Sequence, residues 1–361
     1  MKGQGEDPEK LIEKRKNDHV EICAKEDLAQ DYIYWDDVKL VHNPLPEVDL
    51  DEIDTSTILF GRKLKAPLIV SAMTGGYGKA EEINRTIASV AEHFGIGMGV
   101  GSQRAAIENP QLARTYSVIK EFDVPLRIGN LGVPQLVKQP LRETLEIEHA
   151  KAAMEMIDAH ILAVHMNYLQ EVVQPEGDTR SRGGLRAIEK FASALAIMAK
   201  ETGAGMPREL ALKLKKAGVK GIDVGGLGGT SFSAVEYYRA RSIGDATREN
   251  IGKTFWDWGI PTPVSVVLAN VGIPVVATGG LRSGLDTARS IAIGASAGGM
   301  AGRLLPAALE GEDALSKELG TIIHELKAAM FLVGARNLKE LSKAKALIVG
   351  RSREWLDQLM E

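Results

Sequence analysis

Two stretches near the end of the chain decide the fold: Val275-Val276-Ala277-Thr278-Gly279-Gly280-Leu281-Arg282-Ser283-Gly284, and Ala295–Met300 followed by Ala301-Gly302-Arg303. Each begins with an apolar run of strand length and then turns at glycines. The first continues into a helical pattern over Gly284–Ile293. From Pro67 onward, earlier parts of the chain repeat this order of apolar run, glycine or polar turn, and helix.

The expected strands are almost purely apolar, which is typical of strands that are buried on both faces of a parallel sheet. They are Leu68–Ala72, Ile96–Val100, Leu126–Ile128, Ile161–His165, Ile197–Lys200, Gly221–Val224, Val275–Thr278 and Ala295–Met300. The helices expected between them are Ala80–Phe94, Pro110–Phe122, Leu141–Ile157, Leu185–Leu195, Pro207–Ala217, Ser231–Arg241 and Gly284–Ile293. Eight alternating units predict an α/β fold, a closed (β/α)8 TIM barrel, with a doubly wound open sheet as the alternative.

The segments outside this pattern predict an extension at each end of one domain that spans residues 1–361. Residues 1–60 form an N-terminal extension in which Pro8–Glu26 is a strongly charged helical pattern. Residues 305–361 form a helical tail that ends in Arg351–Met360 and either closes the barrel or makes subunit contacts.

Composition excludes several classes of protein. With 361 residues and 44% hydrophobic content, the chain can bury a large core and is not intrinsically disordered. A net charge of -4 disfavours general nucleic-acid binding. Cys23 is the only cysteine, which excludes an intramolecular disulfide and a cysteine metal cluster. The charge-free run Trp258–Leu281 is broken by prolines and glycines, so we expect no membrane span and a cytoplasmic protein.

The loops after the last two strands predict a phosphate site. In barrels of this kind phosphate groups bind after strands seven and eight, where glycines let backbone N–H groups approach an anion. Arg282 adds a positive charge to the first of these loops. A third glycine loop, residues 225–231, follows strand six and suits the same anion. Glycine is also a common turn residue, so the expectation rests on the loops together.

Polar residues at the other strand ends are candidates for ligand binding, and each has a structural alternative. Lys200 ends an apolar strand and would stabilise negative charge on a flavin, or would form an ion pair with a carboxylate. Glu171 and Glu176 lie in an expected loop, where a carboxylate would hold Mg2+ beside a diphosphate or be solvated. His165 is either a pocket residue or a satisfied core histidine.

An ordered set of motifs resembles the type 2, FMN-dependent isopentenyl diphosphate isomerases from about residue 10 to the C-terminal region. The motifs are Arg15-Lys16-Asn17-Asp18-His19, Ala72-Met73-Thr74-Gly75-Gly76, Gly101-Ser102-Gln103-Arg104, Gly129-Asn130-Leu131-Gly132, His165-Met166-Asn167 with Gln170-Glu171, Lys200-Glu201-Thr202-Gly203-Ala204-Gly205, Gly228-Gly229-Thr230 and Asp257-Trp258-Gly259-Ile260-Pro261-Thr262. The sequence departs from the family at Phe232, where tryptophan is frequent, and lacks a proline or polar turn within Phe191–Lys200.

The resemblance implies an enzyme of isoprenoid biosynthesis that interconverts isopentenyl and dimethylallyl diphosphate without net redox change. It implies reduced FMN, NAD(P)H as a reductant, Mg2+, and a homo-oligomer of four or eight subunits. The implied FMN contacts are Ala72, Met73, Thr74, Ser102, Asn130, Lys200 and Thr230, with Gly280, Arg282, Ala301 and Gly302 at the phosphate end. The implied substrate contacts are Arg15, Lys16, Ser102, Gln103, Arg104 and Gln170, with the N-terminal extension as a lid. The implied catalytic residues are Gln170, His165, Asn167 and His19, and the implied metal residues are Glu171 and Glu236.

Moving a double bond requires a proton to be added at one end and removed at the other, and no pair of carboxylates in the sequence is obviously placed for both steps. We therefore hypothesise that reduced FMN performs the acid–base work at N5 or N1, a choice the sequence leaves open. Two rivals are a 2-hydroxy acid oxidase, disfavoured because no histidine lies in Trp258–Pro261, and a nucleotide dehydrogenase, disfavoured because no barrel loop contains a cysteine. A non-catalytic flavin-binding protein would not need Gln103-Arg104, Gln170-Glu171 or Arg15-Lys16.

Overall fold

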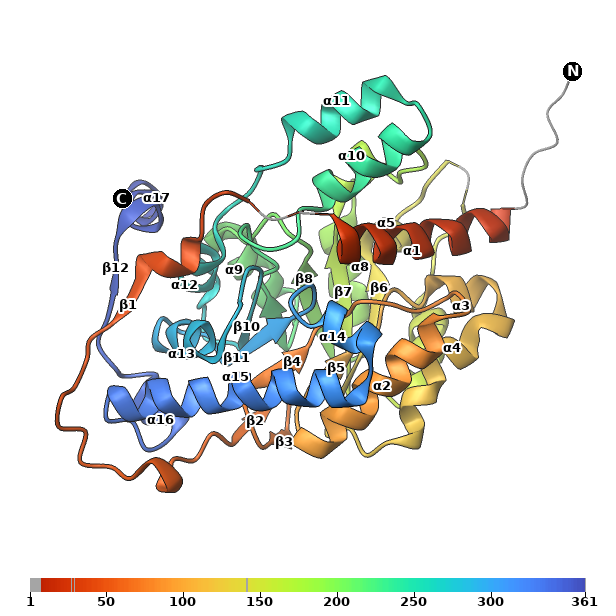
Figure 1. The fold of residues 1–361 in the computed structure, drawn as a ribbon. Helices are drawn as coiled ribbons and strands as arrows, with labels where there is room; N and C mark the ends of the chain where they lie inside the picture. Colours follow the sequence, from red (N-terminus) through yellow and green to blue (C-terminus); the bar gives the residue numbers. More distant parts are fainter. Residues whose placement is uncertain (1–7, 27, 29, 141, 361) are drawn as a thin grey trace, which may run out of the picture.

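The computed structural model describes residues 8–26, 28, 30–140 and 142–360, and Figure 1 shows their arrangement. Eight parallel strands close into a barrel in the order in which they follow along the chain, so the TIM-barrel expectation is confirmed and the open sheet is excluded. The barrel strands are β4 (Leu68–Val70), β5 (Gly97–Gly99), β6 (Leu126–Gly132), β7 (Ile161–Met166), β8 (Ile197–Glu201), β9 (Gly221–Asp223), β10 (Val275–Thr278) and β11 (Ala297–Met300).

Helices follow the barrel strands and cover the outside of the barrel. They are α2 (Ala80–Phe94), α3 (Arg104–Glu108), α4 (Arg114–Ser117), α5 (Val133–Leu136), α6 (Ile147–Ile157), α7 (Tyr168–Val173), α8 (Gly184–Ala192), α9 (Arg208–Lys216), α10 (Phe232–Ser242), α11 (Ala246–Thr254), α12 (Thr262–Ala269) and α13 (Gly284–Ala292). Hydroxyl caps start several of them directly after a loop: Ser231 Oγ accepts from Ala234 N at 3.2 Å, and Ser283 Oγ accepts from Asp286 N at 3.1 Å.

Three local expectations differ from the structure. The helix expected over Pro110–Phe122 is divided into the 3-10 helix η3 (Pro110–Ala113), α4 and the 3-10 helix η4 (Val118–Glu121). Helix α6 begins at Ile147, because Glu146 is extended and caps it, and the expected start at Leu141 lies outside the described residues. Gln170 and Glu171 lie on the short helix α7 rather than in a loop.

A turn separates α8 from β8, although the sequence there contains no proline or glycine. Helix α8 ends at Ala192, and Ser193 Oγ donates to Lys190 O at 2.7 Å. Ala194 N and Leu195 N donate to Phe191 O, which completes the turn before β8 begins at Ile197. Lys200 therefore occupies an ordinary strand position.

The lower half of the barrel interior is an apolar plug. Along each barrel strand, side chains alternate between the surrounding helices and the interior. The inner cluster includes Ile69, Ile128, Met198 and Val276 and is closed from below by Leu59 and Leu64. The last two belong to a hairpin of β2 (Thr57–Leu59) and β3 (Arg62–Leu64), which lies at the lower end of the barrel in Figure 1. Any ligand must therefore enter at the other end, where the strands finish.

The N-terminal extension spans the barrel from one end to the other. Helix α1 (Pro8–Lys25) lies across the upper end beside α10 (Figure 1). The 3-10 helix η1 (Tyr34–Asp37) follows, and Trp35 Nε1 donates to Gly279 O at 2.9 Å. Strand β1 (Val38–Leu40) then pairs antiparallel with β12 (Ala346–Ile348) of the tail. A further 3-10 helix, η2 (Leu50–Glu52), precedes the hairpin.

The tail after residue 304 is helical, as expected. Its elements are α14 (Leu305–Glu310), α15 (Glu312–Leu332), α16 (Leu338–Leu341), β12 and α17 (Gly350–Leu359). Asp37 of η1 joins the tail to the extension, because its Oδ2 accepts from Ser352 N at 2.8 Å. None of the helices in the described residues combines the length and apolar character that a membrane span requires.

Candidate active site

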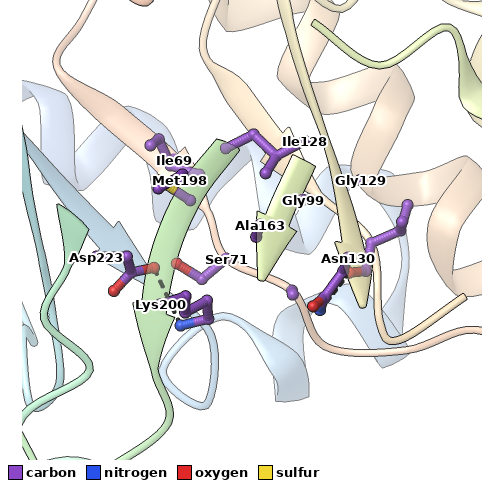
Figure 2. Close-up of a pocket in the computed structure, with 12 residues that line it drawn as sticks. Ile69, Ser71, Gly99, Ile128, Gly129, Asn130, Ala163, Met198, Lys200 and Asp223 are labelled. Carbon is purple, nitrogen blue, oxygen red and sulfur yellow. Dashed lines mark hydrogen bonds and ion pairs between the residues drawn. The ribbon is translucent and has the colours of Figure 1, made fainter. Parts of the chain in front are cut away.

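The interior of the barrel changes from apolar to polar at the upper ends of its strands. Two residues beyond the apolar plug, each strand contributes one inward position, and together these positions form what we call the polar layer. Its members are Ser71, Gly99, Asn130, His165, Lys200, Asp223, Thr278 and Gly299. Most of them line a hollow, shown in Figure 2. The strand ends that the sequence singled out thus meet in one place.

Asn130 and His165 form a fixed pair in the polar layer. Asn130 Nδ2 donates to Val100 O at 3.0 Å, which turns Oδ1 toward His165 Nδ1 at 2.8 Å. Burial, with further contributions from Lys200 and Lys16, lowers the pKa of His165 to about 3. The ring is therefore neutral near pH 7, with its proton on Nδ1 and an unprotonated Nε2.

Lys200 lines the hollow and is also ion-paired. Its Nζ lies 3.0 Å from Asp223 Oδ2, and both side chains are nearly fully buried. The ion-pair alternative for Lys200 is therefore confirmed, and the side chain also lines the hollow, while its action on a flavin stays a prediction. Asp223 was missed because it lies inside the expected strand Gly221–Val224, although a charged residue in an apolar strand is a recognisable signal.

The three glycine loops pack against one another. A Cβ on Gly280 would lie 2.3 Å from Gly228 O, and a Cβ on Gly302 would lie 2.9 Å from Thr230 Oγ1. Thr230, Gly280, Ala301 and Gly302, predicted to contact FMN, therefore belong to one surface. Arg282, predicted at the phosphate end, is held by Asp286 Oδ2 at 3.2 Å and Asp36 Oδ1 at 3.0 Å.

The residues present fit a flavin nucleotide. Within the described part of the chain, the buried hydroxyls of Ser71 and Thr278 have no hydrogen-bond partner. They lie on either side of Gly299, where a Cβ would be 2.5 Å from Ser71 Oγ and 2.3 Å from Thr278 Oγ1. Buried polar groups without partners are costly, so Ser71, which lines the hollow, and Thr278, across Gly299 from it, fit a ligand with hydroxyl or phosphate oxygens.

Lys16 fixes α1 to the loops after β4 and β5. Its Nζ donates to Gly75 O at 2.7 Å, Ser102 O at 2.8 Å and Tyr116 Oη at 2.6 Å. Burial, together with Arg15 and Arg104, holds the pKa of Lys16 well below its usual value. These contacts bring α1 to the loop that contains Ala72, Met73 and Thr74, whose residue Gly75 accepts from Lys16.

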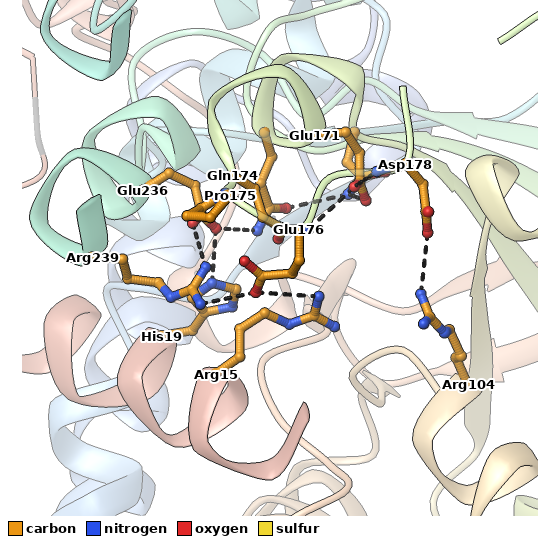
Figure 3. Close-up of polar contacts among 12 residues, drawn as sticks. Arg15, His19, Arg104, Glu171, Gln174, Pro175, Glu176, Asp178, Glu236 and Arg239 are labelled. Carbon is orange, nitrogen blue, oxygen red and sulfur yellow. Dashed lines mark hydrogen bonds and ion pairs between the residues drawn. The ribbon is translucent and has the colours of Figure 1, made fainter. Parts of the chain in front are cut away.

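Gln103 and Arg104 differ in their partners, because Gln103 bonds backbone groups and Arg104 pairs with carboxylates. Gln103 is fully buried, and its side chain joins Asn130 N (2.9 Å) to Ala153 O (2.7 Å). The structure thus uses Gln103 to position Asn130, and it shows no free end toward a substrate. Arg104 pairs with Glu108 at 2.7 Å and Asp178 at 3.4 Å and lies at the edge of the cluster in Figure 3.

A network around Glu236 joins α1, α7 and α10 (Figure 3). Glu236 Oε1 lies 2.8 Å from His19 Nε2 and accepts from Gln170 Nε2 at 2.9 Å, while Oε2 accepts from Arg239 Nη1 at 2.5 Å. Burial opposes ionisation of Glu236, but His19, Arg239 and Gln170 outweigh it and lower its pKa to about 2. Arg239 also bonds Glu176 at 2.9 Å, near Arg15.

Glu171 is held differently from Glu236. Its oxygens accept from Asn167 Nδ2 at 2.9 Å and from Asp178 N at 2.7 Å, and burial raises its pKa. Gln174 Nε2 also donates to Glu171 at 3.2 Å, and no ion pair to Glu171 occurs among the described residues. Glu236, by contrast, is ion-paired with Arg239. No group of three or more His, Cys, Asp or Glu side chains within residues 8–26, 28, 30–140 and 142–360 could hold a metal ion.

Arg239 and Asp178 are parts of this network that the sequence analysis missed. Arg239 lies three residues after Glu236 on α10, a spacing that places the two on one helix face. Asp178 Oδ2 accepts from Arg142 Nη1 at 2.8 Å and from Arg104. Nothing in the sequence indicated that contact, since the three residues lie in separate loops and helices.

Comparison with known proteins places the fold in a class. The FMN-dependent dehydrogenase family matches residues 206–348. A mandelate oxidase with a monooxide FMN adduct superposes with a TM-score of 0.57 at 16% identity, covering 92% of each chain. A mandelate oxidase with (S)-mandelic acid gives 0.59 at 15% identity, covering 95% of this chain and 98% of the other. The fold is thus that of the FMN-dependent α/β barrels.

Curated relatives are much more similar in sequence. Isopentenyl-diphosphate delta-isomerase of Thermoplasma acidophilum is 48% identical over 96% of this chain and 99% of its own length. Those of Picrophilus torridus and Archaeoglobus fulgidus are 44% and 46% identical, again over nearly the whole of both chains. The chain belongs to the isopentenyl-diphosphate delta-isomerase family, and its FMN-type barrel places it with the type 2 enzymes.

Proposed function

We propose that the protein interconverts isopentenyl and dimethylallyl diphosphate by a 1,3-allylic shift of the double bond, with FMN in its reduced form. The observation that supports this most is identity of 44–48% with named isomerases over nearly the whole chain. Reduced FMN would supply a proton donor and acceptor at N5 or N1 beside the alkene.

The polar layer would hold the flavin ring, and the glycine loops its phosphate. Lys200 and Asn130 line the hollow, and Thr230, Gly280, Ala301 and Gly302 share the adjoining surface. The unpartnered hydroxyls of Ser71 and Thr278 would bond oxygens of the ribityl chain or phosphate. Arg282 would bind the phosphate end if it moves from Asp36, since its pair with Asp286 leaves donors free.

The substrate diphosphate would lie between α1 and α7, with α1 as a lid. Arg15 and Arg104 provide positive charge there, and Lys16 keeps α1 on the barrel. Glu171 would hold Mg2+ beside the diphosphate, because Mg2+ binds one or two carboxylates together with phosphate oxygens. Closure of α1 would exclude water and position the alkene.

Four side chains near the expected alkene would direct proton movement. Gln170 is oriented by Glu236, and Asn167 is oriented by Glu171. His165 would present an unprotonated Nε2, and His19 would follow α1 as it moves. We propose further that NAD(P)H supplies the reducing equivalents and that the enzyme is a tetramer or octamer, both of which rest on the family resemblance. We also propose a cytoplasmic location, which rests on the sequence.

Anaerobic proton NMR of isopentenyl diphosphate in D2O tests the proposal. Purified protein is supplied with FMN and Mg2+, with and without a reductant. We expect deuterated dimethylallyl diphosphate only when the flavin is reduced. Full turnover with reduced 5-deazaflavin would contradict the acid–base role of the flavin. No conversion with either oxidised or reduced flavin would contradict the isomerase proposal and favour the oxidase or non-catalytic alternatives.

Two substitutions sharpen the test. Gln170→Ala should lower kcat by roughly 100-fold or more while FMN remains bound, because general acid–base groups and their orienting partners contribute on that scale. Glu171→Gln should remove the Mg2+ dependence of KM, and Mg2+ should no longer raise the melting temperature in the presence of substrate. Val172→Ala, at an exposed position of the same helix, is the matched control.

A further inference from the structure

Asp223 occupies a position in the polar layer that the proposed chemistry does not use. Strand β9 places it in register with Lys200 of β8, and its Oδ2 lies 3.0 Å from Lys200 Nζ. Asp223 is 3% exposed and Lys200 8%. Figure 2 shows both side chains at the edge of the hollow, joined by their ion pair. A buried pair that faces a ligand cavity affects whatever binds there.

The ammonium of Lys200 is held in one place from two sides. Asp223 is itself fixed, since its Oδ1 accepts from Gly225 N at 3.2 Å, the first residue of a glycine loop. Lys200 Nζ also donates to Glu201 O at 3.2 Å. Within the polar layer, Lys200 and Asp223 are the two charged members, because His165 is neutral near pH 7. The pair therefore leaves the layer without net charge.

We propose that Asp223 is a positioning residue that sets the place and the effective charge of the Lys200 ammonium, and through it the preference of the site for oxidised or reduced flavin. The proposal rests on the proposed function in one respect, that FMN binds over the polar layer. Asp223 acts through Lys200 and need not touch the flavin.

The direction of the effect follows from Coulomb's law. Reduced flavin gains negative charge that oxidised flavin lacks, and a positive charge nearby favours it. Asp223 weakens that attraction by neutralising Lys200. Its removal leaves the positive charge uncompensated in a buried site, where charges interact more strongly than they do in water. We expect the ratio of oxidised to reduced FMN dissociation constants to rise roughly tenfold or more.

The test compares Asp223→Asn with the wild-type protein. Asparagine removes the charge and keeps the shape, and its single amide oxygen can accept from Lys200 Nζ or from Gly225 N but not from both. The bound-flavin midpoint potential is measured by anaerobic dye equilibration, together with the dissociation constant of oxidised FMN. A positive shift of the potential is expected. Asp313→Asn, at an exposed position on α15, is the control and should shift nothing.

A double-substitution cycle separates the positioning role from direct contact. In a Lys200→Gln background, Asp223→Asn should have no further effect on the potential. An effect that persists without Lys200 would mean that Asp223 acts on the flavin itself, and an unchanged potential in the single variant would also overturn the proposal. If Lys200→Gln does not retain FMN, the cycle is measured by thermal unfolding of the apo-protein. The double variant should then lose less stability than the sum of the two single ones, and additive losses would overturn the proposal.

The outcomes also distinguish this inference from the proposed function. Failure of the wild-type protein to bind FMN would contradict both. Binding of FMN with no isomerisation would contradict the proposed function, while the potentials would still test Asp223.

Discussion

His19 Nε2 lies 2.8 Å from Glu236 Oε1, and this contact joins the N-terminal helix α1 to α10 across the mouth of the barrel. Glu236 is fully buried and also bonds Gln170 and Arg239. One carboxylate therefore connects the lid, the candidate catalytic glutamine and the helix after the third glycine loop. Its charge state should affect both stability and the docking of α1.

The lowered pKa of Glu236 predicts that the protein loses stability in acid. A pKa lowered from 4.5 to about 2 corresponds to about 3 kcal/mol of stability that is present above pH about 4.5 and is lost as the pH falls toward 2. Glu236→Gln should lower the free energy of unfolding at pH 7 and flatten its decline between pH 5 and pH 3. Denaturant unfolding across this range measures both effects.

The control for that measurement is Glu310→Gln, which changes an exposed carboxylate on α14. It should leave the pH profile of the wild-type protein unchanged. If Glu236→Gln and wild type decline in parallel below pH 5, then Glu236 is not strongly stabilised in its ionised form.

The hydrogen bonds of Lys16 predict that its substitution would release α1 while the barrel stays folded. Lys16→Met removes three hydrogen bonds from Nζ and leaves Gly75 O buried without that donor, at a cost of about 1–3 kcal/mol. Hydrogen–deuterium exchange of the α1 amides should accelerate roughly tenfold or more, while the barrel strands remain protected. Lys25→Met, at a position that is 70% exposed on the same helix, should change little. Equal acceleration in α1 and in the barrel would argue against a separable lid.

The close approach of Gly280 to Gly228 predicts that a side chain at position 280 would lower stability and weaken FMN binding. Gly280 has φ +72°, and its Cβ would lie 2.3 Å from Gly228 O. Gly244 has nearly the same φ, +73°, with no atom within 4 Å. Both alanine variants incur the left-handed backbone cost of about 1 kcal/mol, and Gly280→Ala should lose about 1–3 kcal/mol more and weaken FMN binding. Denaturant unfolding and FMN titration compare the two, and similar losses would show that the loops tolerate separation.

Much of the barrel could be predicted because its signals are local. The apolar strands at Leu68, Ile161 and Val275 each lie next to glycine turns, and buried parallel strands are readable from such runs. Helix α7 was missed because six residues beginning at Tyr168 are too short for a periodic pattern. The division of Pro110–Phe122 was missed because tertiary packing decides where a helix changes to 3-10 turns.

The candidate site could be predicted as a set of strand ends but not as a set of contacts. The position of Lys200 after an apolar strand placed it in the cavity, while its partner depended on the register of β8 against β9. Gln103 looked free for substrate, yet its amide bonds Asn130 and Ala153, which lie far away in the sequence. Sequence alone contains no information on which long-range donors a buried amide will find.

The lowered pKa of His165 predicts a second effect of pH on stability. The fold favours the neutral form of His165, whereas it favours the ionised form of Glu236. Its pKa is lowered from 6.5 to about 3 by burial and by the charges of Lys200 and Lys16. Below pH 6.5 the unfolded chain takes up a proton that the folded protein does not, so stability falls as the pH decreases from 6.5 toward 3. The two pKa values limit the loss between pH 7 and pH 5 to at most about 2 kcal/mol. His165→Gln should remove this part of the pH dependence, whereas His324→Gln, at an exposed position on α15, should not.

Nitrogen-15 NMR of the imidazole provides a direct measurement: the His165 resonances should keep their neutral-form shifts from pH 8 to pH 5. Titration near pH 6.5 would show that the polar layer does not hold this ring neutral.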